Sequence, residues 1–133
     1  MADIRFRIAQ AIQGVRGEIR WKPNSAMRHL EKRQRQKHLP IEAALTDYEH
    51  IITSVLHDGA GQVYLFWYAG TPYVSVVASV QARPWLVMFS LERLMETAFV
   101  LDMPHYLEQP GFEKIGGLDE VLRHESGTIT CRL

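Results

Sequence analysis

Residues 62–80 read QVYLFWYAGTPYVSVVASV, and this stretch decides the fold class. Two runs of β-branched and aromatic residues, 62–69 and 73–80, flank Gly70-Thr71-Pro72, which is a turn sequence. This pattern predicts an antiparallel β-hairpin. A second turn, at residues 81–84, leads into another β-prone run, Trp85–Ser90. Adjacent strands with short links form a meander, so we expect three to four antiparallel strands here.

Two helices are expected before the hairpin. One is amphipathic, begins with Pro40 in its first turn and ends before Asp58-Gly59-Ala60-Gly61. The other runs from Ala26 to about Lys37 after an Asn24 or Ser25 N-cap, and it is almost entirely polar. The apolar stripe of the amphipathic helix that begins near Pro40 consists of Ile41, Ala44, Leu45, Tyr48, Ile51, Ile52 and Val55.

The two ends of the chain give weaker patterns. Residues 3–21 mix strand and helix periods, which predicts a short two-stranded element or a loosely held arm. Residues 91–101 have helical spacing behind a Ser90 N-cap, with Arg93 at the capping-box position. Beyond them we expect a loop-rich extension, 102–133, with helical turns at 118–124 and a terminal strand at 128–132. The predicted fold is therefore one α+β domain: an N-terminal basic arm (1–25), a helix-helix-meander-helix core (26–101) and this extension, which adds a C-terminal helical segment.

Composition excludes several classes of protein. The chain has 133 residues, 47% of them hydrophobic and 23% charged, which is typical of a globular domain. Its only cysteine, Cys131, cannot form an internal disulfide, so disulfide scaffolds and cysteine zinc sites are excluded. No apolar run reaches the ~18 residues of a membrane span, and Asp3, Arg5 and Arg7 occupy the place of a signal peptide's apolar region. We expect a cytoplasmic protein without membrane contact.

A net charge of zero conceals a strong asymmetry. Residues 1–40 carry ten basic and three acidic side chains, a net charge of +7, whereas residues 41–133 carry five basic and twelve acidic ones, a net charge of −7. Such a distribution indicates either a surface that binds a polyanion or complementary surfaces that pair within or between chains.

The basic helix is the first candidate site. His29, Lys32 and Arg33 share one helical face, while Arg28 and Arg35 follow another. Arginine and lysine neutralise phosphates, and a histidine exchanges protons near neutral pH, so this segment suits a nucleic-acid backbone. The alternative is a solvated helix that keeps the protein soluble. The predicted nucleic-acid contacts are Arg28, Arg35, Lys37 and His38.

The remaining patterns do not indicate a catalytic site. The six histidines lack a metal-ligand spacing, and the glycines lack a phosphate-binding motif, so we expect neither a metal nor a cofactor. Both faces of the aromatic hairpin are apolar: one holds Tyr64, Phe66 and Tyr68, the other Trp67. The second apolar face needs another layer, a partner, or bases that stack on its aromatic rings; we expect a second copy of the chain to cover it, which predicts a homodimer or larger oligomer.

The order of elements, with His-Leu-Glu-Lys-Arg at residues 29–33 on a basic helix, then an amphipathic helix and a meander, resembles the barnase–EndoU–colicin–RelE-like nuclease superfamily. The similarity covers about residues 26–90 and is closest to small phage and mobile-element members, some of them toxins.

This resemblance implies a metal-independent ribonuclease in which the RNA 2′-hydroxyl attacks its adjacent phosphate. It assigns catalysis to His29, Lys32 and Arg33, with Arg35 and His38 as auxiliaries and Ser79 and Ser90 as hydrogen-bonding groups. Here Ser90 alone fills the polar position that such domains place at the end of the last strand, a departure consistent with loss of the active site.

Two functions follow from these patterns. The first is a small domain that binds RNA or another polyanion and has ribonuclease activity. The second is a non-catalytic protein interaction domain, such as an immunity, antitoxin or phage accessory protein, that dimerises through its apolar sheet.

Overall fold

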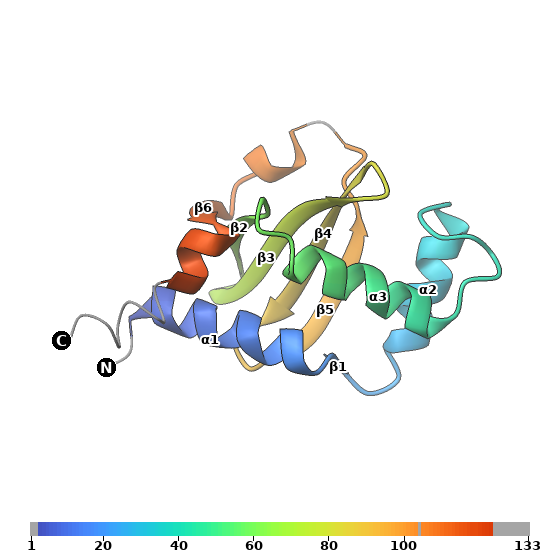
Figure 1. Ribbon diagram of the computed structural model, residues 1–133, viewed down its shortest axis with the longest axis horizontal. Coiled ribbons are helices and arrows are strands. Elements are labelled where there is room, and N and C mark those ends of the chain that lie inside the picture. Colours follow the sequence, from blue (N-terminus) through green and yellow to red (C-terminus); the bar gives the residue numbers. More distant parts are fainter. Residues whose placement is uncertain (1–2, 104, 124–133) are drawn as a thin grey trace.

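The structure is a computed structural model that describes residues 3–103 and 105–123. Three helices from the N-terminal half of the chain and a six-stranded sheet make up most of the domain (Figure 1). The elements are α1 (Ile4–Gly17), β1 (Arg20–Trp21), α2 (Ala26–Arg35), α3 (Leu45–Leu56), β2 (Gln62–Tyr68), β3 (Thr71–Val80), β4 (Arg83–Ser90), β5 (Leu94–Val100), the short 3₁₀ helix η1 (Tyr106–Glu108) and β6 (Phe112–Gly117).

The sheet has the strand order β1-β5-β4-β3-β2-β6. The pairs β2–β3, β3–β4, β4–β5 and β2–β6 are antiparallel, and β1 pairs with β5 in parallel. The α+β class and a meander through residues 62–90 are confirmed. The prediction of three to four antiparallel strands was wrong, because β5 extends the meander while β1 and β6 add an edge strand on each side.

The predicted helix at residues 91–101 is strand β5. Arg93 has a positive φ of 73° and donates its N–H to the Ser90 carbonyl, so a tight turn replaces the expected N-cap. Pairing with β4 through Trp85↔Val100 and Met88↔Thr97 then fixes the extended backbone. Tertiary pairing overrides a helical pattern of this length.

The predicted N-terminal arm is helix α1. The Asp3 side chain accepts a hydrogen bond from the Arg5 N–H at its N-cap, and Ile8, Ala11, Ile12 and Val15 are buried. Two glycines inside the segment cost helix stability, and burial of this stripe outweighs that cost.

Both central helices differ from prediction at one end. Helix α2 begins at Ala26 as expected, and it ends at Arg35. Helix α3 begins at Leu45, because Asp47 accepts a hydrogen bond from the Ala44 N–H and so caps the helix there. Ile41, expected on the buried stripe, is 86% exposed, whereas Ile52 is fully buried. The expected packing of Ile52 is confirmed.

The helices cover one face of the sheet. Figure 1 shows α1 and α3 across this face, and α2 lies at the β5 edge. The opposite face is also covered within the chain: Ser75 and Leu86 are fully buried, and Met88 is nearly so. Aromatic rings pack there, with Tyr106 against Phe99 and against Phe112. The apolar second face that suggested a homodimer is therefore largely enclosed at these positions, and the homodimer itself stays a prediction.

The C-terminal segment agrees with prediction only in part: the expected helical turns are present, but residues 112–117, predicted to be a loop, form strand β6 because they pair antiparallel with β2. Residues 118–123 are helical, and Leu118 is buried. His124, Cys131 and the expected strand at 128–132 lie outside the described residues. Each helix of the described part is too short or too polar to cross a membrane.

Candidate nucleic-acid interface on helix α2

Helix α2 presents the three predicted catalytic residues in different environments. His29 is half-buried and Arg33 is buried, both on the side that faces β5. Lys32 is exposed. The structure therefore brings His29 and Arg33 together against the sheet edge and leaves Lys32 in solvent beside them.

Thr97 of β5 connects His29 with Arg33. Its Oγ1 accepts a hydrogen bond from the Arg33 guanidinium at 3.2 Å and lies 3.5 Å from His29 Nδ1. Trp21 also contacts His29: its ring stacks on the imidazole at a centroid distance of 5.7 Å. Thr97 and Trp21 together fix the plane of the His29 ring.

Sequence reasoning missed both of these positioning residues. Thr97 fell in a segment expected to be helical, and Trp21 fell in the arm. No local signal identifies them, because the spacing at residues 91–101 fits a helix as well as a strand until β4 pairs with it.

Arg33 is a buried cation with neutral partners. Its side chain donates to Gln36 Oε1 and Thr97 Oγ1, and its guanidinium lies 5.4 Å from the centre of the Phe99 ring. Its Nε has no hydrogen-bond partner, and none of the ion pairs in the described part of the chain includes Arg33. A buried charge normally has a counter-ion, whereas neutral hydrogen-bond acceptors and the Phe99 ring hold this one.

The surroundings of His29 favour its neutral form. Burial lowers the pKa of His29 below its ordinary value, and the positive charges of Arg33, Arg28 and Lys32 lower it further. Glu96 acts in the opposite direction, and its carboxylate is paired with Lys22. His29 is therefore neutral at pH 7, and a neutral imidazole can accept a proton.

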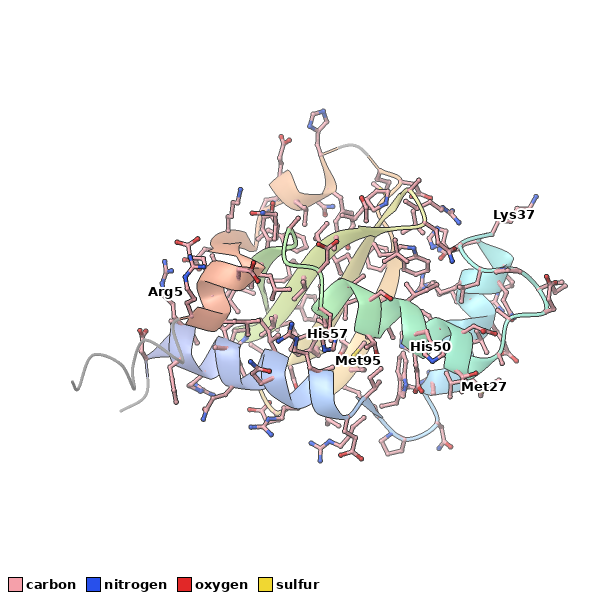
Figure 2. The ribbon with its side chains drawn as sticks, viewed as in Figure 1. Arg5, Met27, Lys37, His50, His57 and Met95 are labelled. Carbon is pink, nitrogen blue, oxygen red and sulfur yellow. The ribbon has the colours of Figure 1, made fainter. Side chains whose placement is uncertain are left out.

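The outer face of α2 carries exposed cations. Arg28, Lys32 and Arg35 recur at intervals of four and three residues on this face, and all three are exposed. Lys37 continues the cluster beyond the helix end, where its own φ of 63° terminates the helix. Figure 2 shows Lys37 at one end of the molecule and Arg5 of α1 at the other. We call Arg28, Lys32, Arg35 and Lys37 the basic face.

His38 is separate from the basic face. Its Nδ1 accepts a hydrogen bond from the Val100 N–H at 3.2 Å, and its Nε2 lies 3.3 Å from an Asp102 oxygen. The side chain is only 4% exposed. The structure thus places this predicted nucleic-acid contact inside the junction between α2 and β5.

The remaining predicted groups lie at strand ends. Ser90 accepts a hydrogen bond from the Leu94 N–H and so supports the turn before β5. Ser79 is exposed opposite Pro84. Within the described residues, no three His, Cys, Asp or Glu side chains converge in the manner of a metal site.

A large cavity lies away from His29. It has a volume of about 970 Å³ and is open, and its walls are the 37–43 loop, α3 and the β3–β4 turn. A smaller cavity of about 340 Å³ lies at the C-terminal end of α2, where it meets β5 and η1. Gln36, the acceptor for Arg33, lines this smaller cavity.

Comparisons with known protein families, with curated proteins and with solved structures find no match for this chain.

Proposed function

We propose that this domain binds single-stranded RNA on the basic face of α2 and cleaves it with His29 as the general base. One observation carries the proposal: a neutral histidine is held by Trp21 and Thr97 next to a set of exposed cations. A phosphate backbone bound by those cations would bring its ribose close to the imidazole.

The basic face supplies the binding energy. Lysine and arginine side chains that contact phosphates release condensed counter-ions, so affinity falls with salt, with a log–log slope of roughly −0.7 per phosphate on a single strand. The exposed Arg28, Lys32 and Arg35 reach a strand without rearrangement of the core.

The chemistry follows from the His29 tautomer that carries its proton on Nδ1. Thr97 Oγ1 has two lone pairs, so it accepts from both Arg33 and His29 Nδ1. The lone pair on His29 Nε2 then takes the proton of the RNA 2′-hydroxyl. The 2′-oxygen forms a bond to phosphorus while the bond from phosphorus to the 5′-oxygen breaks. The leaving oxygen takes a proton from water, and His29 returns its proton to solvent.

The cations have separate roles in that step. Negative charge accumulates on the phosphoryl oxygens in the transition state, and preorganised positive groups stabilise it. Lys32 lies one turn from His29 on α2 and is exposed, so its ammonium group can contact these oxygens. Arg33 acts through Thr97 as a positioning residue.

The binding part is tested by fluorescence anisotropy with a labelled 2′-O-methyl RNA, which the proposed mechanism cannot cleave, at several salt concentrations. We expect the double variant Arg28→Ala/Lys32→Ala to bind more weakly and with a shallower salt slope. Arg5→Ala/Arg7→Ala, which removes two exposed cations from the N-terminal part of α1, is the matched control and should change affinity much less. Equal losses in both variants would show that only overall charge matters.

The catalytic part is tested with His29→Ala, which should keep RNA binding and lose about 10²–10⁴-fold in cleavage rate. Retention of cleavage in this variant would remove His29 from the mechanism.

A protein-interaction function is the second candidate, and the large open cavity favours it. Ile41, 86% exposed, lies on its rim with Trp85 below, and its walls carry both signs of charge. A partner protein that inserts an apolar side chain would bind there. Co-purification of a stoichiometric partner that Ile41→Asp abolishes, without any salt-dependent RNA binding, would favour this function instead.

A further inference from the structure

The small cavity at the C-terminal end of α2 has the composition of a base-binding pocket. Two aromatic rings, Phe99 and Tyr106, contribute to its walls with their ring centres 5.5 Å apart and their planes at 76°. Its volume is about 340 Å³. Bases of single-stranded nucleic acids stack on aromatic side chains in this kind of site.

The pocket lies on the same strip of surface as His29. His29 and Arg33 of α2 and its C-cap residue Gln36 are spaced at four and three residues, and Gln36 keeps αR backbone angles, so the three share the face that meets β5. Along β5, Thr97 contacts the first two of these residues, and Phe99 lies under the guanidinium of Arg33. His29 and Gln36 are about 10 Å apart along the helix axis. One extended strand can therefore occupy both ends of the strip.

The polar groups of the pocket are arranged to accept and donate hydrogen bonds. Asp102 is 66% exposed at its side chain, and one of its oxygens contacts His38 Nε2, which leaves the other oxygen available. Gln36 uses its Oε1 to accept from Arg33, so its amide N–H groups remain available. A carboxylate in a base-reading position accepts from an exocyclic amino group, as with cytosine N4.

We propose that this pocket holds an unpaired RNA base that carries an amino group, stacked on Tyr106 and bonded to Asp102. The proposal rests on the RNA-binding function given above and deepens it, because it assigns a base preference next to the cleavage position. Adenine, cytosine and guanine offer the amino group. Uracil has carbonyl oxygens at the corresponding edge positions, and these repel the carboxylate.

The basic surroundings favour a base over a cationic protein side chain. Aromatic rings beside a carboxylate also suit a lysine or arginine of a partner. Here Arg33 lies directly behind Gln36 and Phe99, and Lys37 and Arg83 flank His38, so a positive ligand would meet repulsion. A neutral base attached to an anionic backbone meets attraction on the same surface.

The test measures binding of labelled eight-nucleotide 2′-O-methyl RNAs of adenosine, cytidine or uridine to the full chain in EDTA; these strands lack the 2′-hydroxyl proton and so stay intact under the proposed mechanism. We expect the wild-type protein to bind the adenosine and cytidine RNAs about tenfold more tightly than the uridine RNA, as one good base contact provides. Asp102→Asn should bring the three affinities within about twofold of each other, since the amide loses the charged acceptor. Tyr106→Ala should lower the affinity for the adenosine and cytidine RNAs most.

Glu108→Gln is the matched control, because Glu108 is an exposed carboxylate of η1 outside the pocket, bonded to His105. It removes the same charge, so it should raise affinity for all three RNAs about equally and keep their order. Equal wild-type affinity for the three RNAs, or the same result for Asp102→Asn and Glu108→Gln, would overturn the pocket while leaving RNA binding intact. Absence of salt-dependent binding to any RNA would overturn the function as well. Binding of a lysine-rich peptide that Asp102→Asn abolishes, in place of RNA, would assign the pocket to a protein partner.

Discussion

Replacement of Arg33 by methionine separates stability from function. Methionine fills a similar space, so the substitution removes the buried charge without a large cavity. Arg33 is 4% exposed, donates to Gln36 and Thr97, and has an unbonded Nε. We expect Arg33→Met to leave the free energy of unfolding within about 1 kcal/mol of wild type, or to raise it, while RNA cleavage falls at least tenfold.

The magnitude comes from opposing terms. The variant loses two hydrogen bonds from a charged donor, each about 1.5–3 kcal/mol. It also removes the cost of burying an unpaired ion, which is several kcal/mol, and the cost of the unbonded Nε, about 1–3 kcal/mol. Arg33 already buries its own methylene groups, so replacing them by those of methionine changes the apolar burial little. These terms nearly cancel, and replacement of buried ions by apolar groups is often neutral or stabilising.

Urea unfolding followed by tryptophan fluorescence measures the stability, and a single-turnover assay measures cleavage. A loss of about 3–5 kcal/mol would refute the reasoning, because that is the cost of breaking a buried charge pair. Unchanged cleavage would show that Arg33 does not position His29 through Thr97.

Three further predictions concern the core, pH and the second positioning residue. Ile52→Ala, at a fully buried site of α3, should lower the free energy of unfolding by about 2–5 kcal/mol in a urea titration, and a loss below 1 kcal/mol would contradict the packing described. His29 and His38 both have pKa values lowered mainly by burial, and Arg33 lowers both; Asp102 raises the pKa of His38, and Arg83 lowers it. Because the unfolded chain binds more protons than the folded one below about pH 6.5, the free energy of unfolding should be highest above that pH and fall as the pH decreases. A urea midpoint that increases when the pH is lowered from 7.5 to 5.5 would show the opposite sign. Thr97→Val should keep RNA affinity and lower the cleavage rate about tenfold with a shifted pH profile, and a rate and profile equal to wild type would remove its positioning role.

Much of the fold was predictable because the signals were local and agreed with one another. The β-prone run at 62–80 and its turn specify a hairpin by themselves, and Tyr48, Ile52 and Val55 are buried as their spacing predicts. Residues 94–100 could not be assigned from spacing, because Leu94, Met95 and Ala98 fit a helix and a strand alike until β4 supplies the partner. Residues 4–17 were ambiguous because two glycines interrupt a helix that tertiary packing stabilises.

The candidate site was predictable only in part. The basic helix was evident from residues 28–37, because charge clusters are visible in sequence. The opposite orientations of Arg33 and Lys32 were not, since burial depends on where β5 lies. Two residues of the site, Thr97 and Asp102, come from segments more than 60 residues away from the histidines that they contact. Trp21 reaches His29 across the loop before α2. A single sequence does not reveal such contacts.

The central claim, that His29 cleaves RNA by activating its 2′-hydroxyl, is tested most directly by a pair of oligonucleotides. One is a single-stranded RNA, and the other has the same sequence with every 2′-hydroxyl removed; each is incubated with the wild-type protein and with His29→Ala in excess EDTA. We predict that the wild-type protein cleaves the RNA to products ending in a 2′,3′-cyclic phosphate, leaves the deoxy strand intact, and loses RNA cleavage in the variant. Cleavage of both strands by the wild-type protein, or of neither, would contradict the claim.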